Sequence, residues 1–197
     1  MKKGLKYGIK PTLSSNKPSW LLEQYEGKLP CLVHNDKTIV ESLDIAEYIE
    51  KSFPYNSLTR QGAYSYQEVL EKVSGLFPAV SACIKNTDPS KDAELIATVN
   101  SQLDILDELL RSTPGQYLCG IELTLADLYL LPQLFHAYVA LDHFKDIEIF
   151  HVDGDPTRPA FENYFSRMLD MEEFNSNRVY VNVDAVIHGW KVARGEA

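Results

Sequence analysis

The sequence has no long hydrophobic run and fewer basic than acidic residues, and these two features exclude two classes of protein. No window holds the roughly 18 consecutive apolar residues that a membrane-spanning helix needs, because polar residues and a proline interrupt the longest apolar stretch, 123–141. Lys and Arg number 19 against 28 Asp and Glu, the formal net charge is −9, and no dense basic cluster occurs. We therefore expect neither a membrane-spanning segment nor a nucleic-acid partner, which would need a basic surface.

Cysteine is also scarce. The three cysteines, Cys31, Cys83 and Cys119, are an odd number at unpatterned spacings, which favours a reducing intracellular compartment over a disulfide framework. Residues 1–8 are basic but lack the apolar segment of a secretory signal. Cytoplasm, chloroplast and mitochondrion stay open as locations. The five histidines are scattered, with no two at i, i+4 on a common helix, so we expect no metal site.

The composition and the order of the elements predict two unequal domains. The chain has 197 residues, 45% of them hydrophobic and 24% charged, which is an ordinary globular balance and leaves room for one or two domains. Strand-like segments occur only in the first third, and helical periodicity follows. This order predicts an α+β protein with a small sheet domain over 1–54, a linker over 55–60 and an all-helical domain over 61–197.

In the first third, hydrophobic patterning and turn residues predict alternating strands and helices. Ser42 is predicted to cap a helix, and Asn35-Asp36 to form a two-residue hairpin turn. The expected strands are 7–13, 29–34 and 38–40, and the expected helices are 20–24 and 42–52.

The rest of the chain shows apolar residues at spacings of three and four, which predict helices. Thr124 and Asp127 form the Thr-x-x-acid pattern of a capping box, in which each side chain bonds the other residue's backbone amide. Pro78 falls inside the first of these segments and predicts a kink there. The expected helices are 61–84, 91–110, 124–143 and 159–170.

Leu29 and Pro30 form the first candidate binding element. If their peptide bond is cis, the backbone amide and carbonyl of Leu29 could pair with an extended peptide as a further strand would. About 5–6% of X–Pro bonds are cis, so spacing alone favours a trans proline that opens an edge strand.

Glu41 and Ser42, at a strand-to-helix junction, form the second candidate binding element. A helix start offers free N–H groups and a positive dipole end, which suit a carboxylate. Ser42 could hold an α-carboxylate and Glu41 an α-ammonium group. The alternative is that Ser42 caps its helix and Glu41 is simply solvated.

Together, Leu29-Pro30, a hairpin and Glu41-Ser42 resemble the glutathione site in the thioredoxin-fold half of glutathione transferases. The resemblance implies that Leu29, before a cis-proline, pairs with the cysteinyl backbone of glutathione. It implies that Glu41 and Ser42 bind the γ-glutamyl end, while the Thr124–Asp127 box serves folding. Lys17 and Lys28 match family lysines near glutathione or substrate carboxylates, with solvated surface lysines as the alternative.

Further segments narrow the resemblance, which extends from about Leu5 to Trp190. Residues 16–21, 139–145 and 186–190 resemble plant-type dehydroascorbate reductases. Residues 81–86, 123–127 and 130–132 also resemble the chloride intracellular channel proteins, which are structural relatives of the reductases.

The sequence departs from this family at its catalytic motif. The family's chemistry depends on Cys-Pro-Phe-Cys/Ser at a helix start, where the thiol becomes a nucleophilic thiolate, and this motif does not occur here. The thioredoxin-like domain is therefore expected to be incomplete at its N-terminus, with no catalytic residue assigned. We expect Cys31 to be buried and inert, although a reactive thiol near the glutathione site stays open. Cys83 and Cys119 are expected to be packing residues.

Two functions follow from the resemblance. The favoured one is a non-catalytic protein that binds glutathione weakly and acts as a binding or structural subunit of a larger assembly with protein partners. The alternative is an active glutathione-dependent dehydroascorbate reductase or thiol transferase whose catalytic cysteine lies upstream of residue 1.

Overall fold

The structure is a computed structural model that describes residues 3–152, 155–175 and 182–196. The chain divides into two compact units between Leu58 and Thr59. We call them the N-terminal unit and the C-terminal unit and describe each by itself. Within the described ranges, no helix is both long and apolar enough to cross a membrane.

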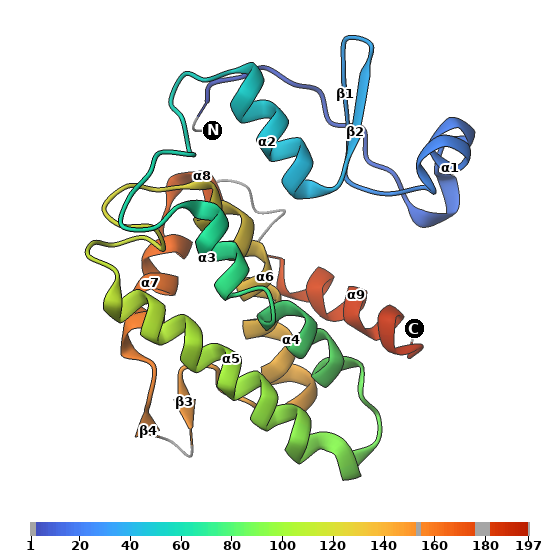
Figure 1. The fold of residues 1–197 in the computed structure, drawn as a ribbon. Helices are drawn as coiled ribbons and strands as arrows, with labels where there is room; N and C mark the ends of the chain where they lie inside the picture. Colours follow the sequence, from blue (N-terminus) through green and yellow to red (C-terminus); the bar gives the residue numbers. More distant parts are fainter. Residues whose placement is uncertain (1–2, 153–154, 176–181, 197) are drawn as a thin grey trace. The chain divides into compact units, whose positions relative to one another are not determined.

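The N-terminal unit consists of a β-hairpin and three short helical segments (Figure 1). The two strands pair antiparallel, with Cys31 opposite Val40 and His34 opposite Lys37. The two-residue turn between them is the predicted one, and Asn35 there takes a φ of 54°, a left-handed conformation that Asn tolerates. The elements are η1 (Ser14–Asn16), α1 (Ser19–Tyr25), β1 (Cys31–His34), β2 (Lys37–Val40) and α2 (Ser42–Ser52).

The strand predicted over 7–13 is wrong. This segment forms no strand, and the large apolar side chains of Tyr7, Ile9 and Leu13 are exposed. An alternating sequence becomes a strand only where it joins a hydrogen-bonded ladder. Among the described residues, β1 and β2 pair only with each other in the N-terminal unit, and the 7–13 segment joins no ladder.

A buried ion pair fixes the beginning of the described chain to the end of α2. Lys3 Nζ lies 2.9 Å from Glu50 Oε1, and the two side chains are only 8% and 6% exposed. The same ammonium donates to the carbonyl of Phe53 at 2.8 Å, while Glu50 Oε2 accepts from the amide of Leu58 at 3.0 Å. These extra hydrogen bonds satisfy charges that would otherwise be costly to bury.

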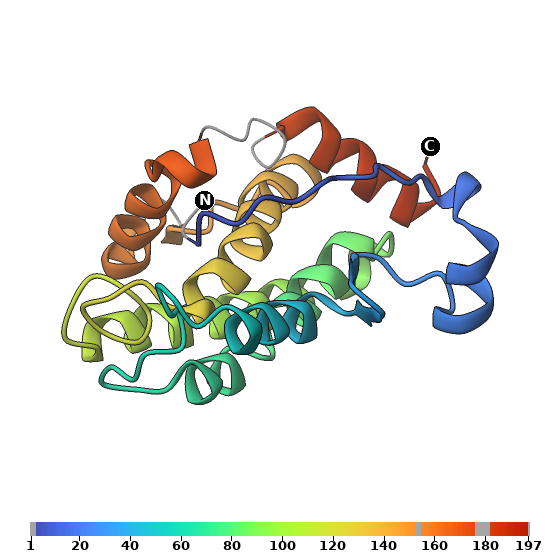
Figure 2. The same ribbon diagram turned by 90° about the horizontal axis from the view of Figure 1, so that it is seen from above.

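The C-terminal unit is a helical bundle built around α6, which packs against α3, α4, α7 and α9 (Figures 1 and 2). The sequence predicted an all-helical domain over 61–197, and the short antiparallel ladder between β3 and β4 departs from that prediction. The elements are α3 (Tyr66–Lys72), α4 (Leu76–Lys85), η2 (Pro89–Lys91), α5 (Asp92–Ser112), α6 (Leu125–Lys145), β3 (His151–Val152), β4 (Asp155–Pro156), α7 (Pro159–Leu169), α8 (Glu172–Asn175) and α9 (Val183–Arg194).

The single helix predicted over 61–84 is two helices, so the expected kink at Pro78 is wrong. The chain breaks at residues 73–75, and Pro78 is the third residue of α4. A proline has no N–H to donate and its ring clashes with the carbonyl four residues earlier. Both problems disappear when the helix restarts so that the proline lies in its first turn.

The predicted capping box at the start of α6 is confirmed and lies in the core. Asp127 is fully buried, and its Oδ2 accepts from the backbone amide and the hydroxyl of Thr124, both at 2.8 Å. Its Oδ1 accepts from the amide of Leu118 at 2.8 Å and the hydroxyl of Tyr164 at 3.2 Å. Burial raises the pKa of Asp127, and these hydrogen bonds act in the opposite direction. The box therefore ties α6, the preceding loop and α7 together.

A buried arginine at the start of α7 is hydrogen-bonded to α5 and to the backbone of Ile149. Arg158 is 1% exposed. Its guanidinium donates to Asp104 Oδ1 at 2.8 Å, to the carbonyl of Ile149 at 2.9 Å and to Asn100 Oδ1 at 3.0 Å. The fork of donors on a guanidinium can satisfy several acceptors at once, which explains how this charge is accommodated.

Candidate functional site

The four central residues of the predicted site lie at one end of the β1–β2 hairpin. Leu29 and Pro30 precede β1, Glu41 and Ser42 follow β2, and the antiparallel register places both pairs at the same end. The Leu29–Pro30 peptide bond is cis, as the family resemblance implies and contrary to the expectation from spacing alone. Leu29 is 46% exposed, and its backbone amide and carbonyl make no hydrogen bond within the described residues.

The junction between β2 and α2 has an unusual backbone. Ser42 is the first residue of α2, so the prediction that it is the N-cap is wrong. The cap is Glu41, with φ 69° and ψ 128° and no capping hydrogen bond from its side chain. Non-glycine residues rarely adopt positive φ, and such conformations cluster at ligand clamps.

The first turn of α2 is open to a ligand. The carbonyl of Glu41 accepts from the amide of Ile45 at 3.0 Å, which is the first hydrogen bond of the helix. The amide and hydroxyl of Ser42 make no hydrogen bond within the described residues. Free donors and the positive end of the helix dipole together favour an anion at this position.

One of the two predicted lysines contacts this junction. Lys28 Nζ lies 3.1 Å from Glu41 Oε1, with the side chains 47% and 58% exposed. The pKa of Lys28 is raised above its ordinary value. The hydrogen bond to Glu41 is the largest cause, and the negative charges of Glu41 and Glu26 add to it. Lys17 instead lies beside Gly27, in the turn after α1. A Cβ added at Gly27 would be 3.4 Å from the Nζ atom of Lys17.

Glu26 was not identified as a site residue from the sequence. It caps the C-terminal end of α1 with φ 54°, and Gly27 follows with φ 68°. A Glu-Gly pair at the end of a predicted helix is a recognisable C-cap signal. Glu26 lies two residues before Lys28, and this spacing was the signal that its negative charge is close to that lysine.

None of the three cysteines has the properties of an activated nucleophile. Cys83 and Cys119 are fully buried, as expected for packing residues, and burial raises the pKa of each thiol. Cys31 is half-buried, so the prediction that it is buried is wrong, and burial raises its pKa also. A reactive cysteine needs a lowered pKa.

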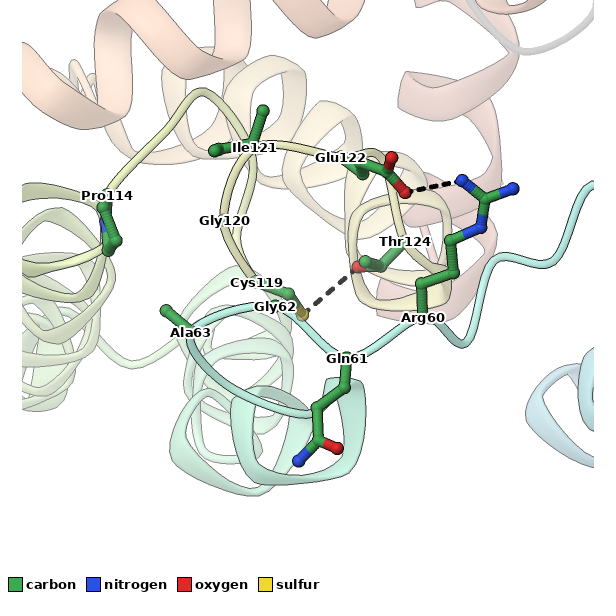
Figure 3. A pocket seen from close by; sticks show the side chains of 10 residues that line it. All are labelled: Arg60, Gln61, Gly62, Ala63, Pro114, Cys119, Gly120, Ile121, Glu122 and Thr124. Atoms are coloured by element: carbon green, nitrogen blue, oxygen red, sulfur yellow. Dashed lines mark hydrogen bonds and ion pairs between the residues drawn. The ribbon is translucent and has the colours of Figure 1, made fainter.

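The C-terminal unit contains a cavity of about 400 Å³ beside the capping box (Figure 3). Residues 60–63 form one wall, and the loop from Pro114 to Thr124 forms the other. Two pairs of the polar groups drawn in Figure 3 contact each other: Arg60 Nη1 pairs with Glu122 Oε2 at 2.8 Å, and the Thr124 hydroxyl lies 3.2 Å from Cys119 Sγ.

Comparison with known proteins finds similarity to glutathione transferases. The family model for the N-terminal domain of glutathione S-transferase matches residues 2–57. Glutathione S-transferase DHAR2 of Arabidopsis thaliana is 26% identical over 178 residues, which cover 90% of this chain and 77% of that protein. Glutathione S-transferase DHAR3, chloroplastic, of the same plant is 25% identical over 190 residues, which cover 96% and 68%.

A solved structure agrees with the sequence comparisons. The crystal structure of Chlamydomonas reinhardtii dehydroascorbate reductase superposes with a TM-score of 0.78 at 29% identity, covering 96% of this chain and 84% of that one. The chain therefore resembles the glutathione transferases and, among them, the dehydroascorbate reductases. Its fold is the expected thioredoxin-like α/β domain followed by a helical domain.

Proposed function

We propose that this protein binds glutathione at the end of the β1–β2 hairpin, as a relative of the dehydroascorbate reductases. The observation that carries the proposal is the Glu41–Ser42 junction. An exposed carboxylate on a positive-φ residue lies next to an uncapped helix start. The α-amino-acid end of glutathione carries one ammonium and one carboxylate group, which are the charges that these two elements can bind.

The other site residues match the rest of the ligand. The free backbone amide and carbonyl of Leu29 are suited to the peptide part of glutathione, in the manner of strand addition. Lys17 and Lys28 supply positive charge for the carboxylates. An intracellular location, including the chloroplast, is part of the proposal, because one of the relatives is named chloroplastic.

The proposal assigns binding rather than nucleophilic chemistry to these residues. The raised thiol pKa values of Cys31, Cys83 and Cys119 leave little thiolate at neutral pH. We therefore do not assign any of these three cysteines to the mixed-disulfide step that a thiol transferase uses.

Calorimetry with reduced glutathione tests the site. We expect measurable binding by the wild type, and about threefold to tenfold weaker binding after either Glu41→Gln or Ser42→Ala, because each removes one polar contact with a charged group. Ser52→Ala, at the other end of the same helix, is the matched control and should leave affinity unchanged. Equal affinity in the wild type and Ser42→Ala would contradict the γ-glutamyl site.

A further inference from the structure

The Glu41 carboxylate is paired with Lys28 in this structure. It is the same carboxylate that the proposed site uses to bind the α-ammonium group of its ligand. Lys28 Nζ lies 3.1 Å from Glu41 Oε1, which is the distance at which a bound ammonium group would lie. The lysine therefore holds the place of the ligand's α-ammonium when no ligand is bound. This inference rests on the proposed function, because it concerns the same carboxylate.

Two ammonium groups around one carboxylate repel each other, so an incoming α-ammonium competes with Lys28 for Glu41. Both side chains are about half exposed, and a pair of this kind is weak. The competition is therefore modest, and Lys28 can leave Glu41 at little cost. Its long side chain keeps the displaced ammonium close to the start of α2.

A zwitterionic head group resolves the competition in a way that a simple cation or anion does not. Its ammonium replaces Lys28 at Glu41, while its carboxylate at the Ser42 end of α2 gives Lys28 a new partner. Before binding, Lys28 pairs with Glu41. After binding, Glu41 pairs with the ligand's ammonium and Lys28 with the ligand's carboxylate, so every charge has a partner of opposite sign. A ligand without the ammonium leaves two carboxylates, Glu41 and its own, to share one lysine.

We propose that Lys28 is a built-in competitor for the ligand's ammonium group at Glu41, and that it determines how strongly the site distinguishes α-amino-acid head groups from deaminated ones. In the free protein, Lys28 neutralises Glu41. With a deaminated ligand, Lys28 remains between two carboxylates and compensates for the missing ammonium. The lysine therefore lowers the selectivity of the site for the amino group.

The test compares two ligands on two proteins. The ligands are glutathione and its analogue without the α-amino group, glutaryl-Cys-Gly, and the proteins are the full-length wild type and Lys28→Met. Met keeps most of the aliphatic side chain and removes the charge. We expect the ratio of the two affinities, glutathione over analogue, to rise by about twofold to fivefold in Lys28→Met at low salt, and the rise to shrink at high salt.

Lys51→Met is the matched control. Lys51 is an exposed lysine in the last turn of α2, nine residues and therefore about 14 Å along the helix from Ser42. Its replacement removes the same charge from the same unit and should leave the affinity ratio unchanged. A rise in Lys51→Met equal to that in Lys28→Met would overturn the proposal, because the effect would then be one of net charge.

The remaining outcomes separate this proposal from the proposed function. If the wild type binds glutathione and Glu41→Gln weakens binding, but Lys28→Met leaves the ratio unchanged, then the glutathione site stands and the competitor role is wrong. An equal loss of affinity for both ligands would make Lys28 a simple carboxylate contact, which also overturns the competitor role. If the wild type binds neither ligand, both proposals fail.

Discussion

The buried carboxylate of Asp127 gives the most detailed prediction about the fold. Replacing it by Ala removes the acceptor for four donors, which come from the amides of Leu118 and Thr124 and the hydroxyls of Thr124 and Tyr164. The Thr124 hydroxyl can still turn toward Cys119 Sγ, 3.2 Å away. Three buried donors then remain unpaired.

The expected cost follows from that count. An unpaired buried donor costs about 1–3 kcal/mol, and part of the sum is offset because the costly burial of the carboxylate also disappears. We expect Asp127→Ala to lower the free energy of unfolding by about 3–5 kcal/mol. For a unit of this size, that corresponds to a decrease in Tm of about 10–15 °C, measurable by circular dichroism or calorimetry.

Asp127→Asn refines the prediction because Asn has the same shape and one acceptor oxygen. Whichever way the amide is turned, its NH2 faces one backbone N–H donor that cannot rotate away. We expect a loss of about 1–3 kcal/mol, smaller than that of Asp127→Ala. The control is Asp142→Ala, an exposed acid on the same helix, which should change stability by less than about 0.5 kcal/mol. A Tm for Asp127→Ala within about 3 °C of the wild type would show that the buried hydrogen bonds to Asp127 do not stabilise the fold as described.

Four further predictions concern stability and pH. Burial raises the pKa of Asp127 in the folded protein above the usual 3.8, so the native state binds this proton more readily than the unfolded chain. The free energy of unfolding should therefore fall as the pH rises from about 4 through the raised pKa. Urea unfolding at several pH values should show this pH-dependent loss in the wild type and not in Asp127→Asn. Arg158→Met should lower the free energy of unfolding by about 1–3 kcal/mol in a denaturant titration, because it leaves the buried carbonyl of Ile149 without its donor; an unchanged midpoint would contradict this. Gly62→Ala should destabilise by about 1–3 kcal/mol, since the new Cβ would lie 2.0 Å from the carbonyl oxygen of Cys119. Gly189→Ala, in the middle of α9 with nothing within 4 Å of the new Cβ, should stabilise by about 0.5–1 kcal/mol, and thermal melts that reverse this order would show the packing argument to be wrong.

Features encoded locally were predicted well from the sequence. The helix over 42–52 and the Thr124–Asp127 box depend on periodicity and on side chains within one turn, and both are confirmed. The hairpin turn at Asn35-Asp36 is equally local. These are the cases in which short-range chemistry and the final structure agree.

Features that depend on distant partners were not predicted. The 7–13 segment alternates as a strand would, but whether it becomes one depends on pairing with another part of the chain. Arg158 and Glu50 have no local signal of burial, because their partners come from other elements. At the candidate site, the positive φ of Glu41 and its ion pair with Lys28 depend on how the hairpin and α2 meet, and no local sequence signal predicts either.

Backbone amide chemical shifts, recorded by NMR during titration with reduced glutathione, locate the binding site residue by residue. We expect saturable shifts centred on Leu29, Ser42 and the following residue Leu43, at the end of the β1–β2 hairpin and the start of α2, and we expect Glu41→Gln to move the titration to higher glutathione concentration. Shifts confined to the C-terminal unit, or no shifts at millimolar glutathione, would contradict glutathione binding at the hairpin.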